Sequence, residues 1–343
     1  MINRRKFIKT SVIIGAGLAI SNASIFARSK TASGLRVGMI GLDTSHCVDF
    51  AIALNATNAN TMFDGFKVVA AWPTLGSSDL PSSNDRLAGF TAQIRKLGIE
   101  IVGSMEELLE KSDVVLLETV DARKHLEQAL PVIKAGKRMF IDKPITASLP
   151  DAMVIFNAAR HYKTPVFSTS SLRYIAGMNE VRNGSFGKVI GAVTYGPATI
   201  EKTHPDLFWY AIHGVEMLFA AMGKGCKTVS RMSIDDTDVV SGVWSDNRIA
   251  TFRGIRSGKR DYGGIVFCEK EIKTLGAYGG YNQQLEVITD FFKTGIVPVD
   301  PEETLDILAF MEAADESKKR GGIPIPIEEI MERAKNEITG SAE

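Results

Sequence analysis

The sequence lacks an excess of charge of either sign, a cysteine framework and a long hydrophobic run. Its 343 residues include 40 lysines and arginines against 40 aspartates and glutamates. A nucleic-acid-binding or membrane-surface protein needs a basic face, which this balance does not predict. Three cysteines, Cys47, Cys226 and Cys268, are too few and too scattered for a disulfide framework or a zinc site. No metal site is predicted, and buried free thiols are favoured over a Cys226–Cys268 bridge.

The first residues have the pattern of an export signal. Arg4-Arg5 precedes a short apolar core from Val12 to Ile20. This core is much shorter than the roughly 20 residues that span a bilayer, and paired arginines are typical of the twin-arginine route. We therefore expect residues 1–30 to be a cleavable signal peptide and the mature protein to be periplasmic, without a membrane anchor.

Between residues 34 and 171, continuous apolar runs alternate with amphipathic helical patterns. This alternation predicts a Rossmann-type, doubly wound parallel sheet. The expected strands are Val37–Leu42, Phe66–Trp72, Glu100–Val102, Val114–Leu117, Arg138–Ile141 and Pro165–Ser168, and the expected helices are Cys47–Leu54, Arg86–Leu97, Met105–Lys111, Ala122–Ala135 and Pro150–His161.

Residues 172–343 have a different pattern, with consecutive strands separated by turn signals. They predict a second, α+β domain built on a large, mostly antiparallel open sheet. The expected strands are Lys188–Tyr195, Thr228–Ser233, Thr237–Trp244, Arg248–Ile255 and Gly264–Cys268, and the expected helices are Leu207–Ala221, Asn282–Lys293 and Pro301–Lys319.

The turn after the first predicted strand reads Gly41-Leu42-Asp43-Thr44-Ser45-His46. A strand–turn–helix layout of this kind seats a dinucleotide diphosphate when it carries G-x-G-x-x-G. Here only the first glycine is present, and a carboxylate at the second position is bulky and has the wrong sign for a diphosphate. The segment Asp43-Thr44-Ser45 is equally suited to cap the helix, while the amides of Thr44–His46 would still face a bound anion. The pattern predicts a site for NAD or NADP in which the cofactor is lost, held differently or replaced.

Other candidate residues follow the neighbouring strands. Trp72 ends the second strand, where a ribose-binding acid is usual, and could stack on an adenine or pack against the strand end. Glu118 and Lys143 end strands that should be adjacent, about 5 Å apart, where they could contact a ligand or form a structural ion pair. His125, one turn into its helix, is a further candidate for the cofactor site or a hydrogen-bonded helix residue.

The segment Phe140-Ile141-Asp142-Lys143-Pro144 resembles the E-K-P signature of the glucose–fructose oxidoreductase/inositol dehydrogenase (Gfo/Idh/MocA) family. Asp113–Leu117 with His125 is similar to the family's fourth strand and following helix, and Glu303 with Ala313-Ala314 is similar to its closing helix. The resemblance implies a Rossmann domain, NAD(P)-linked chemistry on sugars or polyols, and a second domain that often pairs its sheet faces in homo-oligomers.

Within this resemblance, Lys143 and His213 are the expected catalytic residues. His213 is similar to the histidine of a D-x-x-x-H pair, but Trp209 stands at the aspartate position. Asp206 lies seven residues before His213, which in a helix is the same face, and is the expected replacement. Three residues are candidates for substrate contacts: Arg173, His204 and Tyr210. For Arg173, a salt bridge at the domain interface is the alternative.

Three functions remain open at this point. The first is an NAD(P)-dependent oxidoreductase of a sugar or polyol, with the cofactor held tightly. The second is a glycoside-cleaving or isomerising enzyme on the same scaffold, with NAD retained or lost. The third is a carbohydrate-binding protein without catalysis.

Overall fold

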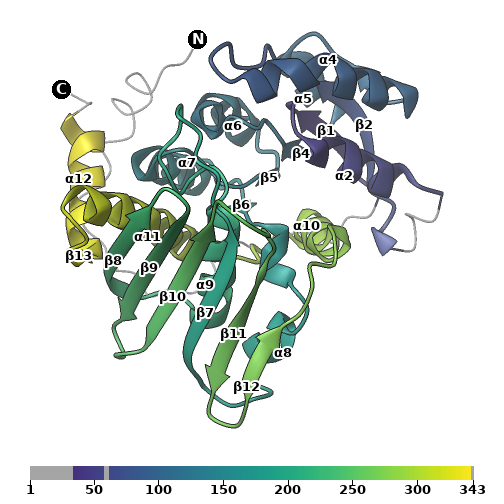
Figure 1. The fold of residues 1–343 in the computed structure, drawn as a ribbon. Coiled ribbons are helices and arrows are strands. Elements are labelled where there is room, and N and C mark those ends of the chain that lie inside the picture. Colours follow the sequence, from purple (N-terminus) through teal and green to yellow (C-terminus); the bar gives the residue numbers. More distant parts are fainter. Residues whose placement is uncertain (1–33, 58–61, 341–343) are drawn as a thin grey trace. The chain divides into compact units, whose positions relative to one another are not determined.

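The computed structural model describes residues 34–57 and 62–340, which form two compact units (Figure 1). The described part of the first unit comprises residues 34–168, 285–298 and 335–340, and the second comprises residues 169–284 and 299–334. The expected signal peptide, residues 1–30, lies outside the described residues. The chain was expected to cross once, between residues 171 and 172. Instead, residues 285–298 and 335–340 belong with the first unit.

The first unit is built on a six-stranded parallel sheet with the order β3-β2-β1-β4-β5-β6. From β1 the sheet extends to one side through β2 and β3 and to the other side through β4, β5 and β6. This is the doubly wound arrangement, and the prediction is confirmed. The strands are β1 Arg36–Ile40, β2 Lys67–Trp72, β3 Glu100–Ile101, β4 Val114–Leu117, β5 Met139–Ile141 and β6 Val166–Ser168; the helices are α2 Ser45–Asn55, α4 Pro81–Lys96, α5 Met105–Lys111, η2 Ala122–Lys124, α6 His125–Lys134, α7 Leu149–His161 and most of α10 Asn282–Thr294.

The return of α10 to the first unit has a packing reason. Phe291 of α10 lies 4.7 Å from Phe167 of β6 between ring centroids, and Phe292 lies 6.0 Å from Phe66, next to β2. Arg138 Nη1 also donates to the Phe292 carbonyl at 2.5 Å. Two buried aromatic rings therefore hold the helix to the parallel sheet.

The second unit is built on a seven-stranded sheet with the order β12-β11-β7-β10-β9-β8-β13, in which only β7 and β10 pair in parallel. The expected, mostly antiparallel open sheet is therefore present. Its strands are β7 Val189–Pro197, β8 Cys226–Ile234, β9 Thr237–Trp244, β10 Ile249–Ile255, β11 Gly263–Cys268, β12 Ile272–Leu275 and β13 Ile325–Pro326; its helices are η3 Ser171–Tyr174, α8 Met178–Arg182, α9 Ile212–Met222, α11 Pro301–Lys319 and most of α12 Ile327–Gly340.

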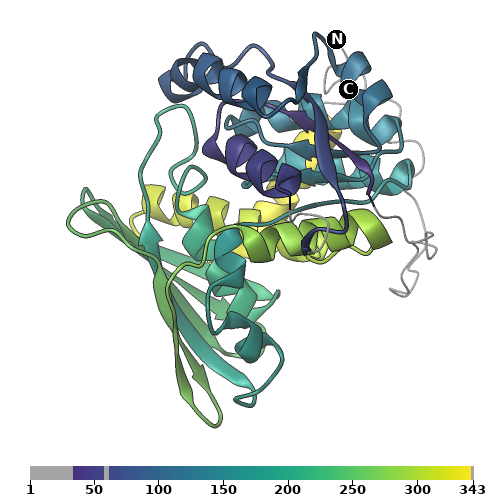
Figure 2. The ribbon, with the colours of Figure 1, turned by 90° about the vertical axis from the view of Figure 1, so that its right-hand side faces the viewer.

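The two faces of this second sheet differ. Helices α9 and α11 cover one face, where Phe219, Trp244 and Phe310 pack together with ring centroids 5.5–6.5 Å apart. Figure 2 shows that the other face carries no helix from the described part of this unit. Apolar side chains on the strands are nevertheless exposed: Met232 by 70%, Ile234 by 66% and Ile249 by 59%.

Two further findings concern the whole described chain. Cys47, Cys226 and Cys268 are buried free thiols, as the sequence analysis favoured. Among residues 34–57 and 62–340, none of the helices combines the length and the apolar character that crossing a membrane would require.

Candidate active site

The carboxyl ends of three neighbouring strands bring the predicted site residues of the first unit together. Leu117 of β4 is in register with Ile40 of β1 and with Ile141 of β5. The next residues continue this pattern, because the Glu118 amide donates to the Ile40 carbonyl at 2.7 Å and the Asp142 amide donates to the Leu117 carbonyl at 2.8 Å. Glu118 and Asp142 are therefore fixed at the sheet edge where ligands bind in folds of this kind.

The turn after β1 keeps the first glycine for a steric reason. Gly41 has a φ of +84°, and a Cβ atom at this position would lie 2.3–2.5 Å from atoms of Thr119. The side chain of Thr44 accepts from the His46 amide at 2.9 Å and caps α2. The cap is therefore Thr44, and the preceding carboxylate is used elsewhere.

Asp43 connects three segments of the first unit. It is fully buried; Oδ1 accepts from the Val120 amide at 2.9 Å and Oδ2 accepts from the Ser83 hydroxyl at 2.5 Å. Burial raises the pKa of Asp43, and these two hydrogen bonds oppose the rise. The first bond joins the β1 turn to the segment after β4, across the point where the strand order reverses. The second joins the turn to the start of α4.

The loop from β2 to α4 is tied to the same segment. Ser77 Oγ donates to Asp121 Oδ2 at 2.5 Å, and Arg123 pairs with both Asp79 and Asp121 at 2.7 Å. Trp72 lies at the end of β2, partly exposed, and its carbonyl accepts from the Gly41 amide at 2.9 Å.

These contacts test whether the turn fits a dinucleotide. A diphosphate grip needs backbone that can approach the phosphates closely. Here a buried side chain, Asp43, occupies the position of the second glycine and bridges the turn to β4 and α4. The residues at this turn do not fit the diphosphate grip that G-x-G-x-x-G provides, although the strand–turn–helix frame is intact.

A cluster of ionisable groups lies at the ends of β4 and β5 and at the start of α2. His46 Nδ1 is 2.9 Å from Asp142 Oδ2 and 4.0 Å from Glu118 Oε2. Lys143 Nζ is 3.9 Å from Asp142 Oδ2, with its side chain 17% exposed. The sequence predicts Glu118, His46 and Lys143 as site residues at the strand ends. It does not identify Asp142 as one, although Asp142 lies next to Lys143 at the end of β5.

The two carboxylates of this cluster have opposite electrostatic behaviour. Burial raises the pKa of Glu118 well above its ordinary value, the nearby Asp142 raises it further, and Lys143 opposes the rise. Burial also acts to raise the pKa of Asp142, but the contacts with His46 and Lys143 outweigh it and hold that pKa below its ordinary value. Neighbouring cationic groups thus compensate the burial of the Asp142 carboxylate, whereas the burial of Glu118 is not compensated.

His125, at the start of α6, is hydrogen-bonded within the protein. Its Nδ1 lies 3.1 Å from the Ile145 carbonyl and its Nε2 lies 2.7 Å from the Thr119 carbonyl. Burial lowers its pKa. The ring links the segment after β4 to the segment after β5. Of the two roles considered for His125, this is that of a hydrogen-bonded helix residue.

In the second unit, His213 lies in the first turn of α9. Its Nδ1 is 2.7 Å from the Ser170 hydroxyl, and its ring is 5.8 Å from that of Tyr210 and 5.6 Å from that of Tyr262. Tyr210 is 41% exposed. These residues form a polar and aromatic group within the second unit.

The expected pairing of Asp206 with His213 is wrong. Helix α9 begins at Ile212, so Asp206 lies in the turns before it and the helical spacing does not apply. Asp206 Oδ2 instead lies 3.1 Å from Arg231 Nη2 and 2.6 Å from Lys318 Nζ. These two cations account for its position and hold its pKa below the ordinary value despite its partial burial.

The expected substrate residues of the second unit also have partners inside it. Arg173 is 2% exposed; it pairs with Glu216 at 3.1 Å and with Glu303. The structure therefore gives Arg173 the role of a salt bridge within this unit. His204 Nδ1 lies 2.9 Å from the Thr203 hydroxyl, and its ring packs 4.9 Å from Trp209.

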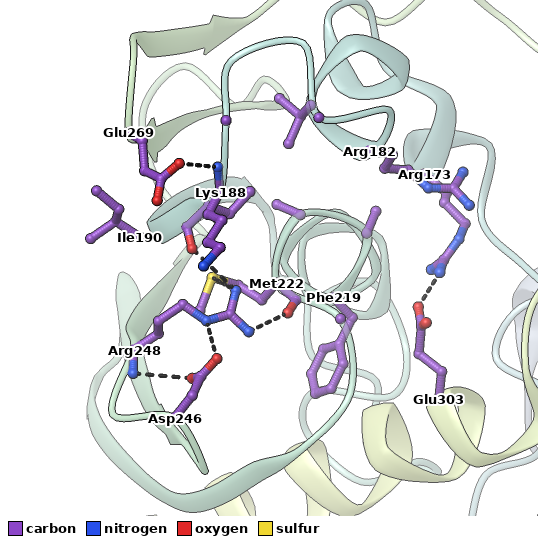
Figure 3. Close-up of a pocket in the computed structure, with 17 residues that line it drawn as sticks. Arg173, Arg182, Lys188, Ile190, Phe219, Met222, Asp246, Arg248, Glu269 and Glu303 are labelled. Carbon is purple, nitrogen blue, oxygen red and sulfur yellow. Dashed lines mark hydrogen bonds and ion pairs between the residues drawn. The ribbon is translucent and has the colours of Figure 1, made fainter.

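An open depression of about 930 Å³ lies on the second unit, and Figure 3 shows the side chains that line it. Arg173 and Glu303 lie on one side of it and Arg248 on the other. Arg248 donates to the Met222 carbonyl at 2.9 Å and to Asp246 at 2.8 Å. Arg173 and Arg248 are therefore engaged with protein partners, and neither His213 nor Tyr210 lines the depression.

Comparison with known proteins finds a family model that matches the first part of the chain. A family model described as an oxidoreductase family with an NAD-binding Rossmann fold, GFO_IDH_MocA, matches residues 35–170. No curated protein matches the chain.

Solved structures with the same fold cover nearly the whole chain. A probable dehydrogenase from Thermotoga maritima is 20% identical, with a TM-score of 0.68 over 86% of this chain and 100% of that one. A scyllo-inositol dehydrogenase from Lactobacillus casei, solved with NAD(H) and scyllo-inositol, is 15% identical, with a TM-score of 0.66 over 86% and 100%. A UDP-N-acetylglucosamine 3-dehydrogenase from Acidithiobacillus ferrooxidans is 15% identical, with a TM-score of 0.65 over 82% and 98%.

At these identities the likeness to solved structures establishes the fold, while the family model covers the Rossmann domain and its strand-end residues. The order of the parallel sheet agrees with the Rossmann fold that the family model describes. Residues 35–170 thus match the GFO_IDH_MocA model of an oxidoreductase family with an NAD-binding Rossmann fold, and the described chain has the fold of the solved dehydrogenases.

Proposed function

We propose that this protein is an oxidoreductase of a sugar or polyol in which Lys143 exchanges a proton with a substrate hydroxyl. The observation that carries the proposal is the position of the Lys143 amine. It follows β5 at the carboxyl edge of the parallel sheet, beside Asp142, with a side chain that is only 17% exposed. A partly enclosed amine at this edge is placed to act as a general acid or base towards a bound hydroxyl.

We further propose that a dinucleotide in this protein is held tightly and is not exchanged at each turnover. The family is NAD-binding, but the turn at Asp43 does not fit the usual diphosphate grip. Holding the dinucleotide would then depend on contacts outside this turn.

Mass spectrometry of the denatured, purified protein tests this proposal. We expect close to one NAD or NADP released per chain, and oxidation of a sugar or polyol by the intact protein. Saturable micromolar binding of added NAD to cofactor-free protein, with fast release, would contradict tight retention.

A second function, glycoside cleavage or isomerisation on the same scaffold, is favoured by one observation. Two hydrogen bonds of Asp43 close the turn where an exchangeable cofactor would bind. In the assay above, this function predicts cleavage or isomerisation of a glycoside without net reduction of added NAD. Net production of NADH or NADPH in proportion to substrate would exclude it.

We propose that the helix-free face of the second sheet pairs with another copy of this chain. Supporting this, Met232, Ile234 and Ile249 are between 59% and 70% exposed on strands of that sheet. Apolar area of this kind contributes about 25 cal/mol per Å² when it is buried. We expect Met232→Glu combined with Ile249→Glu to weaken the oligomer by more than about tenfold, because two charges would enter an apolar interface.

Light scattering coupled to size exclusion measures this change. Lys259→Glu is the control, since Lys259 is 89% exposed and lies in a loop of the same unit. A parent protein that is monomeric at all concentrations, or a double variant that assembles like the parent, would reject the pairing.

We propose export by the twin-arginine route, which Arg4-Arg5 and the short apolar core support. Replacing both arginines by lysine is expected to leave most of the precursor in the cytoplasm, because this route recognises the arginine pair. Cell fractionation and immunoblotting measure the distribution. Equal export of the two forms would disprove the assignment.

A further inference from the structure

We propose that His46, Glu118 and Asp142 form a binding site for a divalent transition-metal ion, of the Zn²⁺ or Mn²⁺ class, at the edge of the parallel sheet. This inference does not rest on the sugar or polyol activity proposed above. It concerns residues of the first unit only, and it replaces the expectation from the sequence that no metal is bound.

The first argument is the convergence of the three donor groups. They come from the first turn of α2, the end of β4 and the end of β5, and one ligand atom from each lies within 4.8 Å of the others. Two atoms on opposite sides of one ion are up to about 4.2 Å apart, for metal–ligand distances near 2.1 Å. The 2.9 Å and 4.0 Å separations from His46 Nδ1 fall within this limit. The third separation, between the two carboxylates, is at most 4.8 Å, so a side-chain movement of less than about 1 Å would bring it within the limit as well.

The second argument is independent and concerns Glu118. This residue is fully buried, and neither of its carboxylate oxygens has a hydrogen-bond partner among the residues that the structure describes. Asp142 Oδ1 is also buried without a hydrogen bond. Burying carboxylate oxygens without partners is costly, and buried charges are normally paired or coordinate metals. The backbone of β1 and β4 holds Glu118 in this position, so the sheet itself presents an oxygen donor to the cluster.

The third argument is charge and donor type. Two carboxylates and a neutral imidazole would carry two negative charges, which a divalent ion balances. Mixed nitrogen and oxygen donors suit zinc and manganese better than calcium, which prefers oxygen alone. The Lys143 amine, 3.9 Å from Asp142, is the nearest competing cation. This amine neutralises at most one of the two negative charges, and it forms no ion pair with Glu118 among the described residues.

Three protein ligands leave at least one coordination position open, which is typical of catalytic rather than structural sites. The His46 side chain is 11% exposed and that of Lys143 17%, so the open position has access to solvent beside the proposed proton-transfer residue. A substrate hydroxyl or carbonyl oxygen is the class of ligand that such a position would take.

The experiment uses the full mature protein, produced without a histidine tag and stripped with a strong chelator. Zn²⁺ and Mn²⁺ are then titrated separately by calorimetry, and the metal content is measured by mass spectrometry. We expect one ion per chain for at least one metal. At 100 times the dissociation constant, the melting temperature should rise by about 5–10 °C.

Glu118→Gln keeps the shape of the side chain and removes its charge, so affinity should fall at least about 100-fold. Asp113→Asn is the matched control: Asp113 pairs with Arg36 at 2.8 Å, just before β4 and thus at the opposite edge of the sheet. It should bind metal like the parent.

If Glu118→Gln fails to fold, His46→Gln provides the same comparison. Absence of stoichiometric binding by the parent, or equal loss in Asp113→Asn, would overturn the proposal. A Glu118→Gln variant that binds as tightly as the parent would show that Glu118 is not a ligand and would also overturn the proposed three-residue site. None of these readouts depends on turnover, so the proposed oxidoreductase function and the metal site can fail separately.

Discussion

Replacing Lys143 by methionine is expected to lower turnover by roughly 100- to 10,000-fold, the range that general acid–base catalysis contributes. Methionine keeps an unbranched stem of similar bulk and removes the amine. The fold should survive, because the contact printed for the Lys143 amine within the described residues is a long one, 3.9 Å to Asp142, and Asp142 keeps His46 at 2.9 Å. Turnover of a sugar or polyol and the melting temperature are measured together.

Lys124→Met is the control for this experiment. Lys124 lies in the same unit and is 43% exposed, with a contact to Glu127 at 3.7 Å, so the variant should keep the activity of the parent. If Lys143→Met retains activity within about threefold of the parent, the amine does not carry the proton and the active site lies elsewhere.

The sequence was informative about this edge of the sheet because local pattern and register coincide there. Apolar runs that alternate with helices predict parallel strands, and parallel strands in sequence order place Glu118 and Lys143 at neighbouring ends. The strand Val114–Leu117 has the predicted bounds, and its pairing with β5 brings the two ends together. No long-range information was needed for this result.

The sequence was less informative where a side chain is bound by a distant segment. Asp43 was interpreted as a cap or a cofactor residue, but its partners, Ser83 and Val120, lie 40 and 77 residues away. The partner of Asp206, Arg231, lies in a strand 25 residues further on. Spacing along a helix could not identify it, because the residues before Ile212 form turns instead of the predicted helix. Periodicity likewise showed that α10 has an apolar face but not which sheet covers it.

The second large effect is expected at Arg231, which lies in β8 and is 1% exposed. Its guanidinium contacts three carboxylates: Asp238 at 3.0 Å, Asp315 at 2.5 Å and Asp206 at 3.1 Å. Arg231→Met would leave these acids without their shared cation. Breaking a buried ion pair from one side typically costs about 3–5 kcal/mol. For a unit of this size, the melting temperature of the second unit should fall by about 6–20 °C.

The loss should depend on pH, in a direction that the carboxylates determine. The pKa values of Asp206 and Asp238 are below their ordinary values in the folded parent, despite burial, because neighbouring cations favour the charged forms. Their contribution is present above the unfolded pKa and is lost as the pH falls. Burial raises the pKa of Asp315 to about 7, and Arg231 opposes that rise. Without Arg231, all three acids should protonate more readily in the folded state. Lowering the pH should therefore reduce the destabilisation that the substitution causes.

Calorimetric melting of the parent and Arg231→Met at pH 8 and pH 5.5 measures this difference, which should be larger at pH 8. Lys259→Met is the control, because Lys259 is 89% exposed in a loop of the same unit, and its melting temperature should stay within about 2 °C of the parent. Asp238 keeps a second cation, Arg256, so the penalty should come mainly from Asp315 and Asp206. An additional Asp315→Asn substitution should therefore recover part of the loss at pH 8. A variant that melts within about 2 °C of the parent at pH 8, or a double variant that recovers nothing, would show that Arg231 does not compensate these acids.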